Sequence, residues 1–163
     1  MVHRGSLNNR YSIIFLAITL FYKAGYTEEI IFTTWDNFEV DKCASVWLIK
    51  RFIASSAQII FYPRGELSTG GIPFDTPDAK FRRYQNKSTF ETLLEYYKIE
   101  DKKAIYIGKI IHDIEINIWE KKAIPETSKV IDEVNKIRNL TMNDQEVIIQ
   151  SCLSYFDTFD LRL

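Results

Sequence analysis

The stretch EIIFTTWDNFEVDKCASVWLIKRFIASSAQIIFY (residues 29–62) decides the fold of this chain. Its two ends, 29–35 and 58–62, are rich in β-branched and aromatic residues and predict β-strands. Between them, apolar residues from Val40 to Ile53 recur at three- and four-residue spacing, which predicts a helix. Two strands joined by one helix of this length indicate a right-handed, parallel βαβ unit.

The segment after the second strand predicts a loop and then a helix. Residues 65–79 are punctuated by glycine and proline, and 80–84 is a short piece that we expect to be extended. Ser88 and Glu91 stand three positions apart, directly before and within an apolar periodic run. This spacing is typical of a capping box at the start of a helix.

The C-terminal half predicts three more helices. Segment 103–119 is rich in isoleucine, which would suit a strand, but its polar residues follow a period near 3.6, so we interpret it as a helix. Pro125 opens the next helix, and Asn143 with Glu146 caps the last one. The predicted fold class is therefore α+β, with a small βαβ-like N-terminal part followed by a mainly helical C-terminal half.

The chain of 163 residues suits a single domain, which we place at residues 29–163. We interpret residues 1–28 as an N-terminal extension or an added apolar helix. Their apolar run, Ile13 to Phe21, is about half as long as a bilayer span requires. A signal peptide is the alternative, although Lys23 to Tyr26 offers no clean cleavage site. Nothing after residue 28 resembles a membrane segment.

The net charge and the cysteine content indicate which partners and which cellular compartment to expect. The net charge of −1 and the pI of about 6.1 lack the basic excess of a nucleic-acid-binding chain, so we expect no nucleic-acid partner for this chain alone. Cys43 and Cys152 are the two cysteines, and their wide separation indicates neither a disulfide framework nor a metal knuckle. We expect both to be free and buried, which favours a reducing, cytoplasmic setting.

His112-Asp113-Ile114-Glu115 is the most informative polar stretch. It lies among isoleucines, where ionisable groups need partners because burying them unpaired is costly. On a helix, His112 and Glu115 point the same way, which suits two metal ligands or a histidine oriented by a carboxylate. The plainer alternative is a histidine at the edge of the core that a neighbouring acid satisfies.

Two further acids extend this stretch into a candidate metal site. Asp41 begins the predicted first helix, and Asp75 lies in a Pro-Phe-Asp loop. With His112, Asp113 and Glu115 they would give an oxygen-rich site for a divalent metal ion. The structural alternatives are a helix cap for Asp41, an Asx-turn for Asp75, and solvated carboxylates for the other two.

Paired arginines offer a different site. Arg51 follows a lysine, Arg82 and Arg83 are adjacent, and Arg64 lies between these pairs in the sequence. Guanidinium groups bind tetrahedral oxyanions through forked hydrogen bonds, and a solvated surface is the alternative. The sequence contains no Walker loop, dinucleotide fingerprint, zinc-protease helix or serine-hydrolase elbow, so it names no reaction.

A series of segments resembles the C-terminal domain of the chromate-resistance protein B (ChrB) family. The matching segments follow the family's order over roughly residues 30 to 160: Trp35, Val40-Asp41-Lys42, Trp47 to Ile53, Ile72 to Asp75, Ser88-Thr89-Phe90, Ile111 to Glu115 and Tyr155 to Phe159. The resemblance implies a cytoplasmic protein of the chromate response, acting as a sensor or an accessory resistance factor.

The resemblance also suggests site residues and leaves the function open between classes. It implies a polar site at Asp41, Asp75, His112 and Asp113, with Arg51 as a possible anion contact. Where family members often have a histidine and a cysteine, this chain has Arg83 and Ser88. That difference favours an oxyanion, bound by Arg51, Arg83 and Asp75, over a transition metal. The alternatives are a metal-dependent enzyme with a divalent metal ion as cofactor, and an interaction domain without a small ligand.

Overall fold

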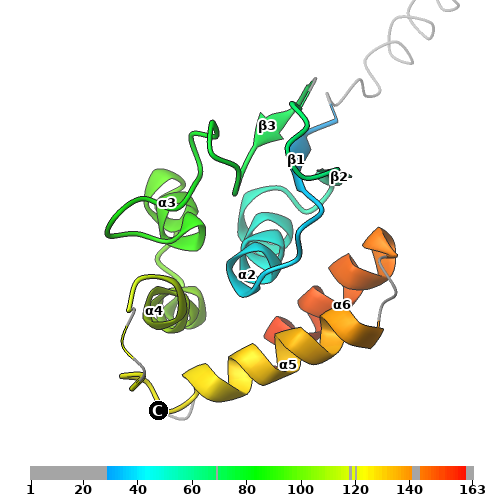
Figure 1. The fold of residues 1–163 in the computed structure, drawn as a ribbon. Coiled ribbons are helices and arrows are strands. Elements are labelled where there is room, and N and C mark those ends of the chain that lie inside the picture. The colour runs from blue at the N-terminus through cyan, green and yellow to red at the C-terminus, as the bar shows by residue number, and fades with distance from the viewer. Residues whose placement is uncertain (1–28, 69, 118, 120, 141–143, 161–163) are drawn as a thin grey trace, which may run out of the picture.

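The computed structural model describes residues 29–68, 70–117, 119, 121–140 and 144–160. A small parallel sheet lies on one side of the molecule, and helices pack beneath it and beside it (Figure 1). The predicted α+β class is therefore confirmed. The expectations for residues 1–28 lie outside the described residues.

The predicted βαβ unit is present. Strand β1 (Ile31–Trp35) leads through helix α2 (Val40–Leu48) to strand β2 (Gln58–Tyr62), and the two strands pair in parallel from Ile31 with Gln58 to Trp35 with Tyr62. Helix α2 continues as the π-helical turn η1 (Ile49–Ile53). Every residue of α2 is buried, because α3, α4, α5 and α6 all pack against it.

A third strand lies on the other side of β1. Strand β3 (Ile72–Pro73) pairs with β1 in parallel, so the sheet order is β2-β1-β3. The sequence had indicated only loop here. Gly71 allows the close approach, because its φ is +77° and a Cβ atom there would lie 2.8 Å from the carbonyl oxygen of Ile31.

Four more helices follow in the part of the chain that the structure describes: α3 (Thr89–Tyr96), α4 (Lys102–Glu115), α5 (Thr127–Leu140) and α6 (Gln145–Thr158). Both halves of the predicted capping box at Ser88 are formed. The isoleucine-rich segment is a helix, as its polar period indicated. The cap of α6 is Asp144, whose side chain accepts from the backbone N–H of Val147, and Asn143 lies outside the described residues.

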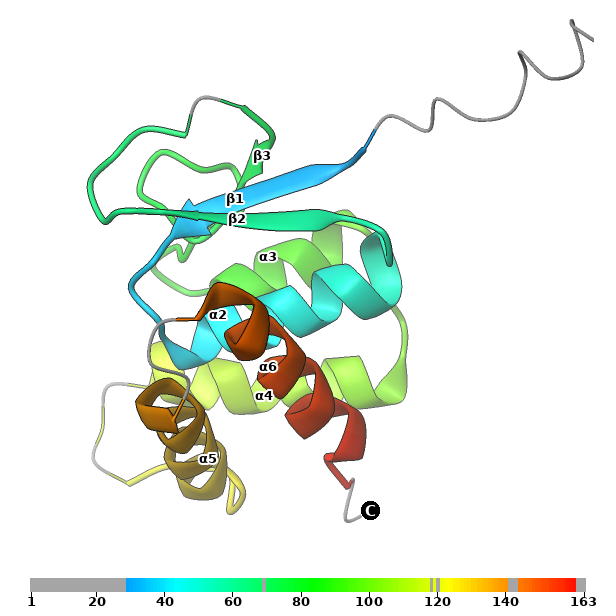
Figure 2. The same ribbon diagram turned by 90° about the vertical axis from the view of Figure 1, so that its right-hand side faces the viewer.

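The prediction of two free cysteines is wrong. Cys43 of α2 and Cys152 of α6 form a disulfide, although they are 109 positions apart in the sequence. Both cysteines occupy buried positions, and the packing of α6 against α2 (Figure 2) brings their Cα atoms to 5.5 Å. The inference from free thiols to a reducing compartment therefore loses its support.

Candidate functional site

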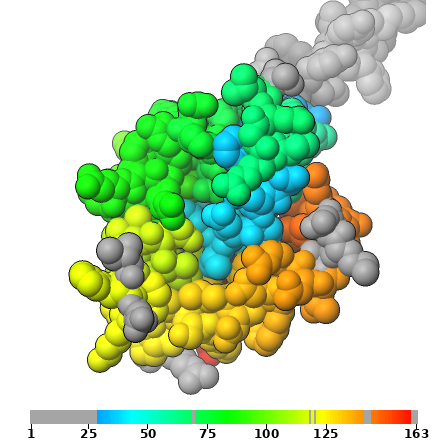
Figure 3. Space-filling view, viewed as in Figure 1, coloured from blue at the N-terminus to red at the C-terminus, as the bar shows by residue number. Residues whose placement is uncertain are grey.

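A polar hollow of about 210 Å³ opens where the three parallel strands end. The central strand β1 has β2 on one side and β3 on the other, so the strand order changes direction at β1. In open parallel sheets, ligands commonly bind in the crevice outside the carboxyl ends of the strands where the order changes direction. In Figure 3 the blue to cyan surface lies between the green part of the molecule above and the yellow to orange part below. The lining residues come from the strand ends, α2, the loop before α3 and the end of α4: Trp35, Asn37, Glu39, Asp41, Arg64, Asp75, Thr76, Pro77, Arg82, Arg83 and Glu115.

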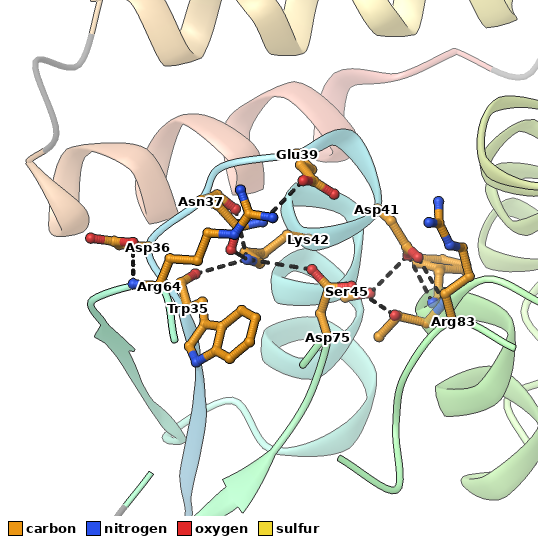
Figure 4. Close-up of polar contacts among 12 residues, drawn as sticks. Trp35, Asp36, Asn37, Glu39, Asp41, Lys42, Ser45, Arg64, Asp75 and Arg83 are labelled. Atoms are coloured by element: carbon orange, nitrogen blue, oxygen red, sulfur yellow. Dashed lines mark hydrogen bonds and ion pairs between the residues drawn. The ribbon is translucent and has the colours of Figure 1, made fainter. Parts of the chain in front are cut away.

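Lys42 is buried behind this hollow and contacts three residues that line it, Trp35, Asn37 and Asp75 (Figure 4). Its fully buried ammonium donates to the carbonyl oxygens of Trp35 at 2.8 Å and Asn37 at 2.6 Å, and to Oδ1 of Asn37 at 2.9 Å. Oδ2 of Asp75 lies 3.4 Å away and forms an ion pair with it. Burial lowers the pKa of Lys42, whereas the charge of Asp75 opposes that shift. No local sequence pattern indicates this role of Lys42, because its partners Trp35 and Asp75 lie in other elements.

Asp75 is held in a strained backbone conformation. Its φ is +51°, in the left-handed region that few residues other than glycine adopt. Its Oδ1 accepts from the hydroxyl of Thr89 at 2.9 Å, while its Oδ2 faces Lys42. Burial raises the pKa of Asp75, and Lys42 and Thr89 oppose this. The side chain therefore links β3, α2 and α3, which is more than the Asx-turn that the sequence offered as its alternative role.

Asp41 binds the N-terminus of another helix. Its two carboxylate oxygens accept from the backbone N–H groups of Thr89 and Phe90 at 2.7 and 2.8 Å, at the start of α3. A carboxylate is favourable there because a helix N-terminus carries a partial positive charge. Burial, followed by the nearby charges of Asp75 and Glu115, raises the pKa of Asp41 well above its usual range, against these N–H bonds. The predicted cap is therefore real, but it caps α3 rather than Asp41's own helix.

Arginine side chains form the outer wall of the hollow. Arg83 donates to Glu115 at 2.8 Å, and its side chain is 57% exposed. Burial raises the pKa of Glu115, and Arg83 opposes this shift. Arg82 lies over the ring of Tyr84, and Arg64 follows β2. Within the described residues, neither Arg64 nor Arg82 has an ion-pair partner.

His112 belongs to a separate pair. Its Nδ1 lies 3.0 Å from both carboxylate oxygens of Glu91 on α3, and its side chain is 43% exposed. The same Glu91 carboxylate accepts from the backbone N–H of Ser88 in the capping box. His112 does not line the hollow, so the imidazole predicted at the centre of the site lies outside it. A histidine satisfied by a neighbouring acid was the plainer alternative, and this geometry matches it.

Asp113 binds the chain between α4 and α5 through hydrogen bonds. Its buried carboxylate accepts from the side chains of Asn117 and Thr127 and from the backbone N–H groups of Ala123 and Ile124, at 2.7 to 3.0 Å. Burial alone would raise the pKa of Asp113, but these four hydrogen bonds together hold it far below its usual range. The alternative of a solvated carboxylate is therefore wrong for Asp113, which instead holds the loop before α5 in place.

Arg51 also lies away from the hollow. Its guanidinium forms a forked ion pair with Asp157 of α6, whose Oδ1 also accepts from Nε1 of Trp47. Of the predicted site residues, the hollow thus brings together Asp41, Asp75, Arg83 and Glu115, and leaves out Arg51, His112 and Asp113.

The predicted five-residue metal site does not form as one cluster. The candidate ligands belong to four separate sets of polar contacts: Asp41 and Asp75 around Thr89, His112 with Glu91, the bonds of Asp113, and Glu115 with Arg83. Among the residues that the structure describes, no group of three or more His, Cys, Asp or Glu side chains is arranged to hold a metal ion. That a smaller set of them binds a metal stays a prediction.

The fold and the hollow define a small α+β domain with a mixed-charge site at the carboxyl edge of its parallel sheet. The family model described as ChrB, C-terminal domain, matches residues 32–161, and the chain belongs to that family. This membership relates the protein to chromate resistance. Comparisons with curated proteins and with solved structures found no match. No helix in the described part of the chain has the length and apolar character needed to cross a bilayer.

Proposed function

We propose that this chain is an accessory or sensing domain of the chromate response that binds a small oxyanion in the hollow beside Lys42 and Asp75. The observation that carries the proposal is that three arginines, Arg64, Arg82 and Arg83, line one hollow. They come from two loops at the carboxyl edge of the sheet, where ligands commonly bind. Chromate and sulfate are tetrahedral dianions, which forked guanidinium donors suit.

The charges around the hollow are compatible with an anion, because the buried acids are already engaged. Asp75 is paired with Lys42, Glu115 with Arg83, and Asp41 with the N-terminus of α3. Their pKa values are also raised, mainly by burial, so they bear less negative charge at a given pH than exposed acids would. Among the described residues Arg64 has no ion-pair partner, and Arg82 donates to the carbonyl oxygen of Ala79 from Nη1, so its other N–H groups can still donate to a ligand.

Because these carboxylates already have hydrogen-bond or ion-pair partners, a metal-dependent enzyme is the weaker alternative. A divalent cation would have to compete with Lys42, Arg83 and backbone N–H groups for the carboxylate oxygens. The imidazole of His112 does not line the hollow and is paired with Glu91. A cytoplasmic setting is part of the proposal, and the family resemblance is its support.

A thermal-shift titration tests the proposal. Sulfate is the first probe, because it has the shape and charge of chromate without its oxidising power. At a concentration 100-fold above the dissociation constant, binding should stabilise the fold by about 2.7 kcal/mol. For a domain of this size that corresponds to a shift of about 5 to 10 °C in Tm. Because the acids around the hollow have raised pKa values, the shift should grow as the pH is lowered.

Variants locate the binding. Arg64→Gln and Arg83→Gln should each reduce the sulfate shift, whereas Arg138→Gln on α5 removes the same charge elsewhere and should leave it unchanged. Arg51→Gln should also leave it unchanged, because Arg51 is paired with Asp157 away from the hollow. The proposal is wrong if neither sulfate nor chromate shifts Tm, or if Zn²⁺ or Mg²⁺ alone does so.

A further inference from the structure

A second hollow adjoins the first. It has a volume of about 130 Å³, and Trp35 and Thr76 line both hollows. Its other walls include the side chains of Tyr62, Leu67 and Pro73, so much of its surface is aromatic or aliphatic. Because they share Trp35 and Thr76, we treat the two hollows as the charged half and the mainly apolar half of one cleft at the carboxyl edge of the sheet.

The apolar half is fixed by hydrogen bonds. Nε1 of Trp35 donates to the carbonyl oxygen of Glu66 at 2.8 Å, which ties the indole to the loop after β2. The hydroxyl of Ser68 donates to Oγ1 of Thr33 at 2.8 Å and fastens the same loop to β1. The carbonyl oxygen of Trp35 accepts from the buried Lys42, so the wall that the two halves share is anchored to helix α2.

Leu67 supports a ligand role for this half. Its side chain is 78% exposed in the same short loop, although it lines an apolar hollow. A ligand that covered Leu67 would remove apolar surface from water, which favours binding. Small-molecule sites typically combine such an apolar wall with a few well-placed polar groups.

We infer that the ligand is an organic anion, with a tetrahedral phosphate or sulfonate head on a small apolar or aromatic body. The head would bind the arginines of the charged half, and the body would lie against Trp35 and Leu67. This inference rests on the proposed function, because the anionic head would use the same arginines, and it extends the ligand from a bare oxyanion to one that carries an apolar body.

Isothermal titration of the full chain with inorganic phosphate and with phenyl phosphate tests the inference. Phenyl phosphate should bind at least about tenfold more tightly, since a buried apolar group typically changes affinity by about 10- to 200-fold. The Leu67→Ser variant should lose most of that advantage and keep the wild-type affinity for inorganic phosphate. Leu140→Ser is the matched control, because Leu140 on α5 is 80% exposed and lies outside the cleft, and it should bind both probes as the wild type does.

The outcomes separate this inference from the proposed function. Equal affinities for the two probes, or a phenyl phosphate advantage that survives Leu67→Ser, would overturn the inference and leave oxyanion binding intact. If neither probe binds, and sulfate gives no thermal shift, the proposed function is wrong and the inference falls with it. Loss of the advantage in Leu67→Ser, but not in Leu140→Ser, supports the inference.

Discussion

Replacing Lys42 by methionine should destabilise the domain by about 3 to 5 kcal/mol, because it breaks a buried ion pair by removing one partner. The carbonyl oxygens of Trp35 and Asn37 would lose their Lys42 donor. Each buried polar group left unsatisfied costs about 1 to 3 kcal/mol. The carboxylate of Asp75 would lose its counter-charge as well. Methionine has a similar length and adaptable packing, so the cavity contribution should be small.

Urea unfolding at pH 7, followed by far-UV circular dichroism, measures this loss in the disulfide-bonded protein. The slope of unfolding free energy against urea concentration should be the same for Lys42→Met and the wild type. An equal slope would show that both proteins expose the same surface area on unfolding. Lys136→Met is the control, because Lys136 is 63% exposed and pairs with Glu133 on the surface of α5. It should lie within about 0.5 kcal/mol of the wild type.

A double-mutant cycle with Asp75→Asn isolates the ion pair. Asparagine tolerates the left-handed backbone of Asp75 and keeps an acceptor for the Thr89 hydroxyl. The loss in the double variant should be smaller than the sum of the two single losses by about 1 to 3 kcal/mol. If Lys42→Met costs less than about 1 kcal/mol, or if the two losses simply add, the reasoning is refuted.

Three further predictions concern residues outside the hollow. Asp113→Asn should destabilise the fold at neutral pH, and because the folded pKa of Asp113 is depressed, its difference from the wild type should shrink as the pH falls below about 4. A difference in urea midpoint that does not depend on pH would contradict this. His112→Ala should lower the free energy of unfolding by less than about 1 kcal/mol, because the His112–Glu91 pair is partly exposed. The sulfate-induced shift in Tm should not change. If the variant loses that shift, His112 takes part in binding. Reducing the bond between Cys43 and Cys152 should cost about 2 to 5 kcal/mol in urea unfolding. The stability of the Cys43→Ala/Cys152→Ala double variant should not depend on reductant. If the stability of the wild type does not depend on reductant either, the disulfide does not form.

Local features of the sequence predicted most of the fold. The strands at 31–35 and 58–62 follow from β-branched and aromatic runs, and the capping box at Ser88 marks the start of α3. Strand β3 escaped prediction because a two-residue strand has no periodicity, and its pairing depends on the neighbouring β1.

The candidate site was only partly predictable. Asp41, Asp75, Glu115 and Arg83 were selected from the sequence by residue type, and they do line one hollow. Their partners could not be found in the same way. Nothing in the order of residues says that His112 would meet Glu91 rather than Asp75, because that choice depends on how α4 packs against α3.

The sequence by itself determined most of the helices and strands of this protein, since periodicity, caps and turn residues act within a few positions along the chain. Only the tertiary structure decided the pairings: Lys42 with Asp75, Asp41 with the start of α3, and Cys43 with Cys152. The physical reason is that ion pairs, buried hydrogen bonds and disulfides depend on distances of a few ångströms between residues that lie tens of positions apart. Those distances are set by how whole helices pack around α2.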